Sequence, residues 1–383
     1  MTIDRFLNDV SKEIGYKFGT PWRYSDKALG VVVPILRQDG IYEERVYITL
    51  EEAKDQGVTF KDTGRIDRII LETKSRKPIF VRSGTAFKSG GTQPRAVETS
   101  VIIVPQEQKE EDKIPVAPII TVQEIPVRCI HSTKPINPGT KFEYGGFVPS
   151  EVENVLMSKS GQTATWNAVS ASTNRLMSQH SRSGTSHHTF RSDRIGSGTL
   201  GRASTNDLVG VMEDVDKFTG DIDKILAKVP LFEYQVGAVF LDMKDVIGLE
   251  LFDHPKSWES IHKEVEKRLG ESLAKEEEKT FFKPDYDSIK PLTLAFLKKL
   301  LESEKMETRH GMASTVTLKG DGVIGEATTI DGKVIHLIGM KDSKKNKGDV
   351  RPDSTIRDVV QRLTAYSHTP DTRSRRTGTA LIM

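Results

Sequence analysis

Short runs rich in valine and isoleucine recur along the first 130 residues, and Gly, Pro or charged residues separate them. β-Branched residues in such runs are typical of β-strands. We therefore predict strands at residues 29–36, 44–50, 65–73, 77–83, 99–105 and 125–130. The regular spacing of these runs favours an antiparallel sheet, sandwich or barrel.

Two short helices accompany these strands. Apolar residues at helical spacing predict an amphipathic helix at residues 3–16, before the first strand. Thr49 and Glu52 have the spacing of a capping box, in which each side chain accepts from the other's backbone amide. A short helix is therefore expected directly after residue 49.

The apolar period changes after Pro149. Helical stripes predict helices at 150–157, 160–177, 206–229, 257–278, 287–304 and 356–363. Two hairpins are expected between them, one joining 236–241 to 246–251 and one spanning 322–340. The second hairpin has Asp331–Gly332 at its turn, a pair that suits positive φ angles.

These elements predict an α+β fold. Its N-terminal part is an antiparallel, sandwich- or barrel-like sheet, and helices then frame the two C-terminal hairpins. We divide the chain into an N-terminal helix and strand extension (1–46), an α+β domain (47–340), and a basic linker, short helix and disordered tail (341–383). Residues 179–205, rich in Ser, Thr, His and Arg, are expected to be a flexible insertion in that domain.

Composition narrows the possible classes of protein. The net charge is only 56 − 54 = +2, so the whole chain has no strong attraction to nucleic acid or to an anionic membrane. Cys129 is the only cysteine, which excludes an intramolecular disulfide and a cysteine-based zinc cluster. No signal peptide and no apolar run of roughly 20 residues is recognisable. We expect a cytoplasmic protein without a membrane segment, and the sequence indicates no oligomeric state.

The glycine-rich connection "GTAFKSGGTQPRAVE" at residues 84–98 is the first candidate site. It lacks the Gly–Lys–Ser/Thr ending of a phosphate-binding Walker loop. Gly90 and Gly91 could let backbone amides approach an anion, with Arg95 as a forked donor. Alternatively, the segment is a hairpin loop whose glycines satisfy unusual backbone angles. Both interpretations stay open at this point.

Other reactive side chains give no recognisable catalytic or metal site. His180, His187 and His188 fall in the flexible insertion, and Cys129 lies in a strand-like run, so we expect a buried and inert thiol there. We therefore predict no catalytic residues, no metal ligands and no cofactor. Residues 341–383 carry ten Lys and Arg against five Asp, so the tail and the insertion could contact RNA or a ribosome.

The order of several motifs resembles the ADP-ribosylglycohydrolase and rhodanese-phosphatase associated protein family of bacteria and archaea. The likeness extends from Tyr47 to Met340, and the insertion and tail fall outside it. The matching positions are Thr49–Ala53, Lys77–Val81, Gly84, Phe87, Gly90, Gly91, Gln93, Arg95, Val101–Pro105, Pro126, Val127, Cys129, Ile130, Gln162, Thr165, Trp166, Gly332, Val334, His336 and Leu337. Thr85 and His131 stand where acidic residues are usual in the family.

The resemblance implies a link to ADP-ribose and phosphate chemistry, without catalytic residues to transfer. Our hypothesis is that Gln93, Arg95 and His336 line one polar pocket, with Trp166 as its wall. The ligand-binding candidates are Gly90, Gly91, Gln93, Arg95, Gln162, Trp166 and His336.

An amide, a forked cation and an aromatic face suit a nucleotide or an ADP-ribose-like ligand. We expect a non-catalytic ligand- or partner-binding protein in an ADP-ribose- or stress-related system. The alternatives are an enzyme of ADP-ribose or phosphate metabolism and an RNA- or ribosome-associated factor. The same residue types would also serve a buried network that fixes a helix to the sheet.

Overall fold

The computed structural model describes residues 2–23, 30–38, 44–105, 120–130, 134–182, 207–218, 230–242, 245–273 and 286–342. The chain divides into two units, and all described residues belong to the first, Met1–Lys345. The expected helix at 356–363, residues 183–205 of the insertion and residues 343–383 of the tail lie outside the described residues.

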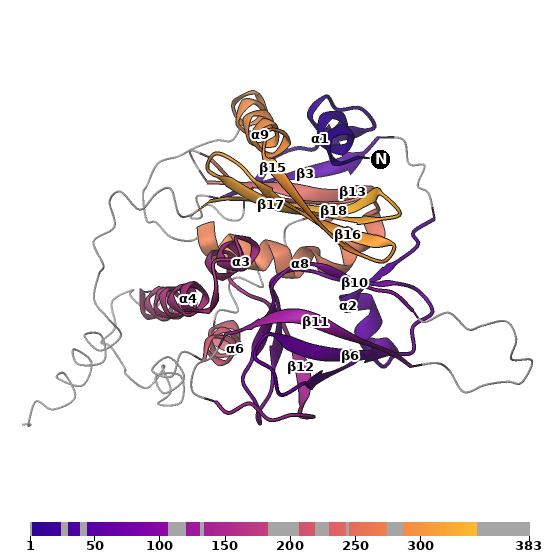
Figure 1. The fold of residues 1–383 in the computed structure, drawn as a ribbon. Helices are drawn as coiled ribbons and strands as arrows, with labels where there is room; N and C mark the ends of the chain where they lie inside the picture. The colour runs from indigo at the N-terminus through magenta and orange to yellow at the C-terminus, as the bar shows by residue number, and fades with distance from the viewer. Residues whose placement is uncertain are drawn as a thin grey trace, which may run out of the picture. The chain divides into compact units, whose positions relative to one another are not determined.

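The N-terminal strands close into a barrel, which confirms the expected barrel-like part (Figure 1). Its order is β11-β6-β5-β12-β8-β9. Alternating positions such as Phe60, Ile69 and Phe87 fill its interior, because successive side chains of a strand point to opposite faces. The strands are β5 (Thr59–Asp62), β6 (Arg68–Thr73), β8 (Thr85–Lys88), β9 (Arg95–Val97), β11 (Thr121–Cys129) and β12 (Lys141–Phe147).

A small sheet of β4 (Ile48–Thr49), β7 (Ile79–Val81) and β10 (Val101–Ile103) alternates with the barrel strands in sequence. The predicted strand at 44–50 is wrong for most of its length, since only residues 48–49 pair. The capping box explains the short strand. Thr49 and Glu52 cap α2 (Leu50–Ala53) as expected, and the 3₁₀ turn Lys54–Gln56 follows.

A nine-stranded antiparallel sheet holds both predicted hairpins, β13–β14 and β17–β18. The hairpins are adjacent because β14 pairs with β18, and Asp331 and Gly332 have the expected positive φ angles of 49° and 72°. The order is β1-β3-β13-β14-β18-β17-β16-β15, with β2 also paired to β3. The strands are β1 (Tyr16–Phe18), β2 (Trp22–Arg23), β3 (Val31–Arg37), β13 (Gln235–Leu241), β14 (Val246–Phe252), β15 (Glu304–His310), β16 (Ala313–Lys319), β17 (Val323–Ile330) and β18 (Lys333–Lys341).

The first strands of the chain belong to this same sheet. β3, which we placed in an N-terminal extension, pairs along its length with β13, which follows it by about 200 residues. Its central residues are buried on both faces, from Val31 to Ile35. A strand covered on both faces reads as a continuous apolar run, which is the pattern of "VVVPIL".

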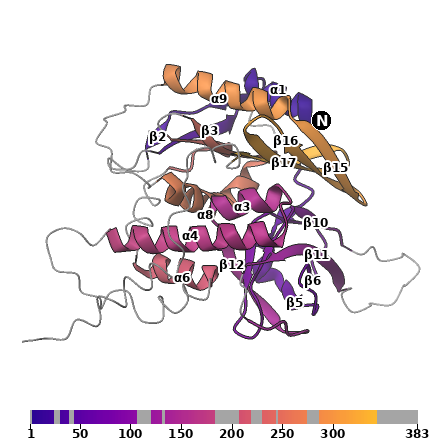
Figure 2. The same cartoon turned by 60° about the vertical axis from the view of Figure 1, so that its left-hand side comes forward.

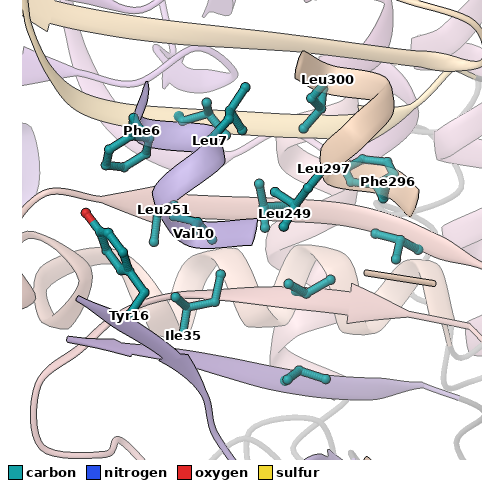
Figure 3. Close-up of a cluster of buried hydrophobic side chains, with 14 of the residues drawn as sticks. Phe6, Leu7, Val10, Tyr16, Ile35, Leu249, Leu251, Phe296, Leu297 and Leu300 are labelled. Carbon is teal, nitrogen blue, oxygen red and sulfur yellow. The ribbon is translucent and has the colours of Figure 1, made fainter. Parts of the chain in front are cut away.

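Helices cover both faces of the large sheet. On one face, α1 (Ile3–Ser11) and α9 (Tyr286–Leu301) bring Phe6, Leu7 and Leu297 onto β3 and β14 (Figure 3). On the other face, Trp258 and Ile261 of α8 (Pro255–Leu273) pack with Phe240 and with Phe80 of β7. This second core therefore joins the large sheet to the small one.

Three further helices pack against the outside of the barrel: α3 (Ser150–Met157), α4 (Gln162–Arg182) and α6 (Leu208–Phe218). They share a core with barrel residues such as Ala86 and Ala96, and Figure 2 shows α4 running between α3 and α6. None of the helices in the described ranges combines the length and apolar composition needed to cross a membrane.

The pairing of β13 with β14 depends on a glycine. A Cβ atom at Gly237 would lie 2.1 Å from the backbone oxygen of Glu250 and 2.8 Å from the Cα atom of Leu251. We expect Gly237→Ala to lower the free energy of unfolding by about 3 kcal/mol or more, since strand backbones have to separate. Urea denaturation measures this loss.

Gly90→Ala is the matched control, because a Cβ atom there meets nothing within 4 Å. It should change the free energy of unfolding by less than about 0.5 kcal/mol. Equal stability of the two variants would contradict the close approach of β13 to β14.

Candidate functional site

The predicted site residues fall into two polar clusters. Gln93, Arg95 and Gln162 gather around Cys129 of the barrel. His336 lies in β18 of the nine-stranded sheet, where it contacts Glu250, Phe80 and Phe252. The structure therefore does not form the single pocket that we expected to contain both Arg95 and His336.

The glycine-rich connection is a hairpin between β8 and β9, which pair directly. Its tip is held from one side by the segment that precedes β12. The backbone N–H of Gln93 donates to the Pro135 carbonyl at 3.1 Å. The side-chain amide of Asn137 donates to the Gly91 carbonyl. Gly90 and Gly91 are exposed at the tip. The hairpin interpretation of this connection is correct, and the tip still presents backbone to solvent.

Arg95 points inward from β9 and is completely buried. Its Nη1 donates to the Gln93 backbone carbonyl at 2.7 Å and to Gln93 Oε1 at 3.3 Å. Its Nη2 lies 3.9 Å from Oδ2 of Asp62, which accepts a hydrogen bond from Thr92. Within the described residues, Nε and Nη2 of Arg95 have no hydrogen-bond partner. Arg95 is thus a buried support for the loop and does not face solvent.

Cys129 orients two side-chain carboxamides, because its thiol donates to one of them and its carbonyl oxygen accepts from the other. Its buried thiol donates to Gln93 Oε1 at 3.0 Å, and its carbonyl accepts from Gln162 Nε2 at 2.7 Å. Both glutamines are half-buried. Within the described chain, Gln93 Nε2 and Gln162 Oε1 make no hydrogen bond, so one donor and one acceptor stay available.

Trp166 lies one turn beyond Gln162 on α4, so the two side chains share a face of that helix. Trp166 is 36% exposed, so part of its ring faces solvent. We call Gln93, Gln162 and Trp166 the carboxamide patch. The family motifs named these three residues, and the structure adds that Cys129 bonds to both glutamines.

Arg82, which the sequence analysis did not select, forms the centre of the second cluster. Its guanidinium is 4% exposed and uses all five of its donors. Nε and Nη2 donate to Glu250 at 2.6 and 2.7 Å. Nη1 and Nη2 donate to Glu153 at 2.5 and 3.3 Å, and Nη1 also donates to the Ser83 carbonyl at 2.8 Å. The flat face of Arg82 lies 4.5 Å from the centre of the Phe147 ring.

His336 completes the pairing of Glu250. Its Nε2 lies 3.0 Å from Glu250 Oε1, and its ring packs between Phe80 and Phe252 with centroids 4.7 and 4.6 Å away. Burial lowers the pKa of His336 despite the opposing effect of Glu250. Burial alone would raise the pKa of Glu250, but the charge and hydrogen bonds of Arg82, with His336, hold it at about 2. Glu250 is therefore the ionised partner of Arg82.

Two further carboxyl groups carry the network into neighbouring elements. Burial raises the pKa of Glu153 to about 7, Arg82 opposes this rise, and the charge of Glu250 adds to it. Glu326 of β17 accepts from the Ser100 amide at 2.9 Å, and burial raises its pKa as well. Thr315 of β16 donates to the Ser100 carbonyl at 2.8 Å. The network thus ties the segment before β10 to the large sheet.

A sequence signal for this network exists. Glu250 and Glu326 are charged residues inside the apolar strand runs "VIGLELF" and "VIGEAT", and Arg82 ends the run "IFVR". A charge at such a position is buried only when it is paired. Partners so distant in sequence cannot be matched from the pattern alone.

A separate pocket of about 350 Å³ lies between barrel strands β6 and β11 and strand β16. Arg65, Arg68, Gln123 and Thr315 are among its lining residues, and none of the predicted site residues reaches it. Arg65 is already paired with Asp67 at 3.2 Å. Within the described residues, no group of three or more His, Cys, Asp or Glu could hold a metal ion.

The buried carboxyl of Glu153 gives the network a pH dependence. The pKa of Glu153 is about 7 in the folded chain, above the ordinary 4.5, so the folded chain binds the proton more tightly than the unfolded chain does. The stability that this proton binding contributes is complete below pH 4.5 and is lost as the pH rises through 7. Glutamine does not titrate. Between pH 5 and 8, we expect the free energy of unfolding of Glu153→Gln to rise relative to the natural chain by about 2–3 kcal/mol.

Denaturation at a series of pH values measures this change. Glu143→Gln is the control, since Glu143 is 79% exposed, and its difference from the natural chain should keep the same value across the series. If the difference in free energy of unfolding between Glu153→Gln and the natural chain also stayed constant with pH, Glu153 could not be neutral in the folded chain.

Comparison with known proteins identifies the family of the chain. A family model described as the ARG and Rhodanese-Phosphatase-superfamily-associated Protein domain matches residues 15–340. No curated protein and no solved structure gives a significant match. The matched residues include β1 to β3 as well as the barrel, the helices and both hairpins. The chain therefore belongs to the ARG and Rhodanese-Phosphatase-superfamily-associated Protein family.

Proposed function

We propose that the chain is a non-catalytic binding protein that recognises a nucleotide or an ADP-ribose-like ligand at the carboxamide patch. The observation that carries this proposal is the arrangement around Cys129. One residue orients two half-buried carboxamides, and it leaves one donor on Gln93 and one acceptor on Gln162. A flexible glutamine seldom presents a fixed hydrogen-bonding edge without such support.

A donor on Gln93 and an acceptor on Gln162 would match the edge of a nucleobase. Adenine, for example, presents an amino donor beside a ring-nitrogen acceptor. Gln93 Nε2 would donate to the ring nitrogen, and Gln162 Oε1 would accept from the amino group. Because the Gln93 oxygen is already held by Arg95 and Cys129, little side-chain entropy is lost when the ligand binds.

The surroundings of the patch suit the rest of such a ligand. The exposed face of Trp166 can stack on a planar base. The first turn of α4 contains no acidic residue, and its amide groups carry the partial positive charge that favours a phosphate. The exposed Gly90–Gly91 tip allows close approach of a ligand to the backbone.

The chemistry of the patch favours binding over catalysis. Its members are amides and an indole, which are poor acids and bases at neutral pH. The carboxyl groups with strongly shifted pKa values at Glu153 and Glu250 are instead buried and bonded to Arg82. An enzyme of ADP-ribose or phosphate metabolism would need such a group beside the patch. The RNA alternative rests on residues 179–205 and 341–383, most of which lie outside the described residues.

Calorimetric titration with ADP-ribose, AMP and ribose 5-phosphate tests the proposal. We expect ADP-ribose and AMP to bind and ribose 5-phosphate to bind more weakly, because it lacks the base. Trp166→Ala should weaken binding of AMP by about 5- to 150-fold, the range expected for loss of one base–aromatic stack. Gln162→Ala should weaken it by about tenfold through loss of one hydrogen bond.

Asn167→Ala is the matched control, since Asn167 is exposed and adjacent to Trp166 but lies on another face of α4. It should bind AMP as the natural chain does. The proposal fails if none of the three compounds binds, or if Trp166→Ala and Asn167→Ala bind equally well. Conversion of a bound compound to a product would favour the enzyme alternative.

A further inference from the structure

Strand β15 is an open edge of the nine-stranded sheet. It pairs with β16 through all seven residues, and in the described chain it has no strand on its other side (Figure 2). Every residue from Glu304 to Arg309 is exposed. An edge of this length with regular pairing is a template for another strand, whereas natural edges are usually short, bulged, covered or protected by charged side chains.

The register shows which backbone groups face outward. His310 pairs with Ala313 across a two-residue turn, so these two residues exchange both backbone hydrogen bonds. Hydrogen-bonded and non-hydrogen-bonded pairs alternate along an antiparallel ladder. The N–H and C=O groups of Thr308, Met306 and Glu304 therefore point toward β16. Those of Lys305, Glu307 and Arg309 point to the free edge.

We propose that β15 pairs antiparallel with β15 of a second copy of this chain, on a two-fold axis at Met306. In this register Lys305 of one copy lies opposite Glu307 of the other, and the same pair recurs on the other side of the axis. Each of these pairs joins residues whose backbone groups face outward, as hydrogen bonding requires. The strand is thus complementary to itself in both charge and backbone pattern.

Met306 explains the position of the axis. Its side chain is 47% exposed, and Met306 would face its own copy in a non-hydrogen-bonded pair, where side chains approach most closely. If the axis lay at Glu307, the Glu307 carboxylates of the two copies would face each other, and Lys305 would face Arg309, so these pairs would join like charges. An axis at Thr308 keeps opposite charges paired but leaves the Met306 pair unformed.

Contacts within the chain hold the charged side chains of β15 away from its free backbone groups. Lys305 contacts Asp4 of α1 at 3.1 Å, and Arg309 donates to Glu307 at 3.0 and 3.1 Å. These contacts hold the charged side chains on the face of the sheet that carries α1. Met306 lies on the opposite face, because side chains alternate along a strand. The charges therefore flank the free backbone and do not cover it.

Charge reversal tests the proposal in the full chain. Analytical ultracentrifugation over a concentration series should show a species of twice the 42.7 kDa monomer mass. Lys305→Glu alone and Glu307→Lys alone should each raise the dissociation constant by about tenfold or more, because like charges then oppose each other twice. The double variant Lys305→Glu/Glu307→Lys should restore the dimer, since opposite charges face each other again.

Cysteine cross-linking tests the register independently of affinity. Met306→Cys should form a disulfide-linked dimer on mild oxidation, because a non-hydrogen-bonded pair brings Cα atoms to about 4.5 Å. Met312→Cys is the matched control, being similarly exposed at 43% but located in the turn, and should stay uncross-linked. Thermal melting of each variant checks that the fold is intact.

Several outcomes would overturn the proposal. A chain that stays at 42.7 kDa at every concentration, with no cross-link through Met306→Cys, shows that the edge is solvated or covered by another segment of the same chain. Efficient cross-linking of Thr308→Cys in place of Met306→Cys would exclude this register. Equal cross-linking of Met306→Cys and Met312→Cys would indicate random collision.

Discussion

A single buried guanidinium joins the main parts of this fold. Arg82 follows β7 and precedes the barrel strand β8, yet its partners Glu250 and Glu153 come from the large sheet and from α3. A buried charge is tolerated only with such complete pairing, so the three elements have to meet at this point. One arginine cannot neutralise three carboxylates. Glu250 therefore keeps its charge, while the pKa values of Glu153 and Glu326 rise.

The network also explains the first glycine of the family motif. Gly84 has a φ angle of 75°, and a Cβ atom there would lie 3.0 Å from Glu153 Oε1. A side chain at this position would disturb the carboxyl group of Glu153, which is bonded to Arg82. From Gly84 the chain enters β8 and returns through Gln93 and Arg95 to the carboxamide patch. One glycine-rich segment thus serves two clusters: Gly84 lies against the buried Arg82 network, and Gln93 belongs to the carboxamide patch.

Local signals predicted much of the fold, and long-range pairing accounts for what they missed. The Asp331–Gly332 turn and the Thr49 capping box depend on neighbouring residues, and both are present. β9 has only three residues and follows a glycine-rich stretch, so no pattern revealed it. At the site, the family motif named Gln93 and Gln162, which the structure brings to Cys129. It could not show that His336 pairs with Glu250, because that contact follows from the register of β14 on β18.

The most direct test of the account measures the free energy of unfolding of Arg82→Met by urea denaturation. Methionine keeps much of the side-chain volume but leaves Glu153 and Glu250 buried without a cation, which should remove about 3–5 kcal/mol. Arg65→Met, at a site 59% exposed, removes the same charge and should lose less than about 0.5 kcal/mol. A loss for Arg82→Met as small as that for Arg65→Met would contradict the central role of the buried network.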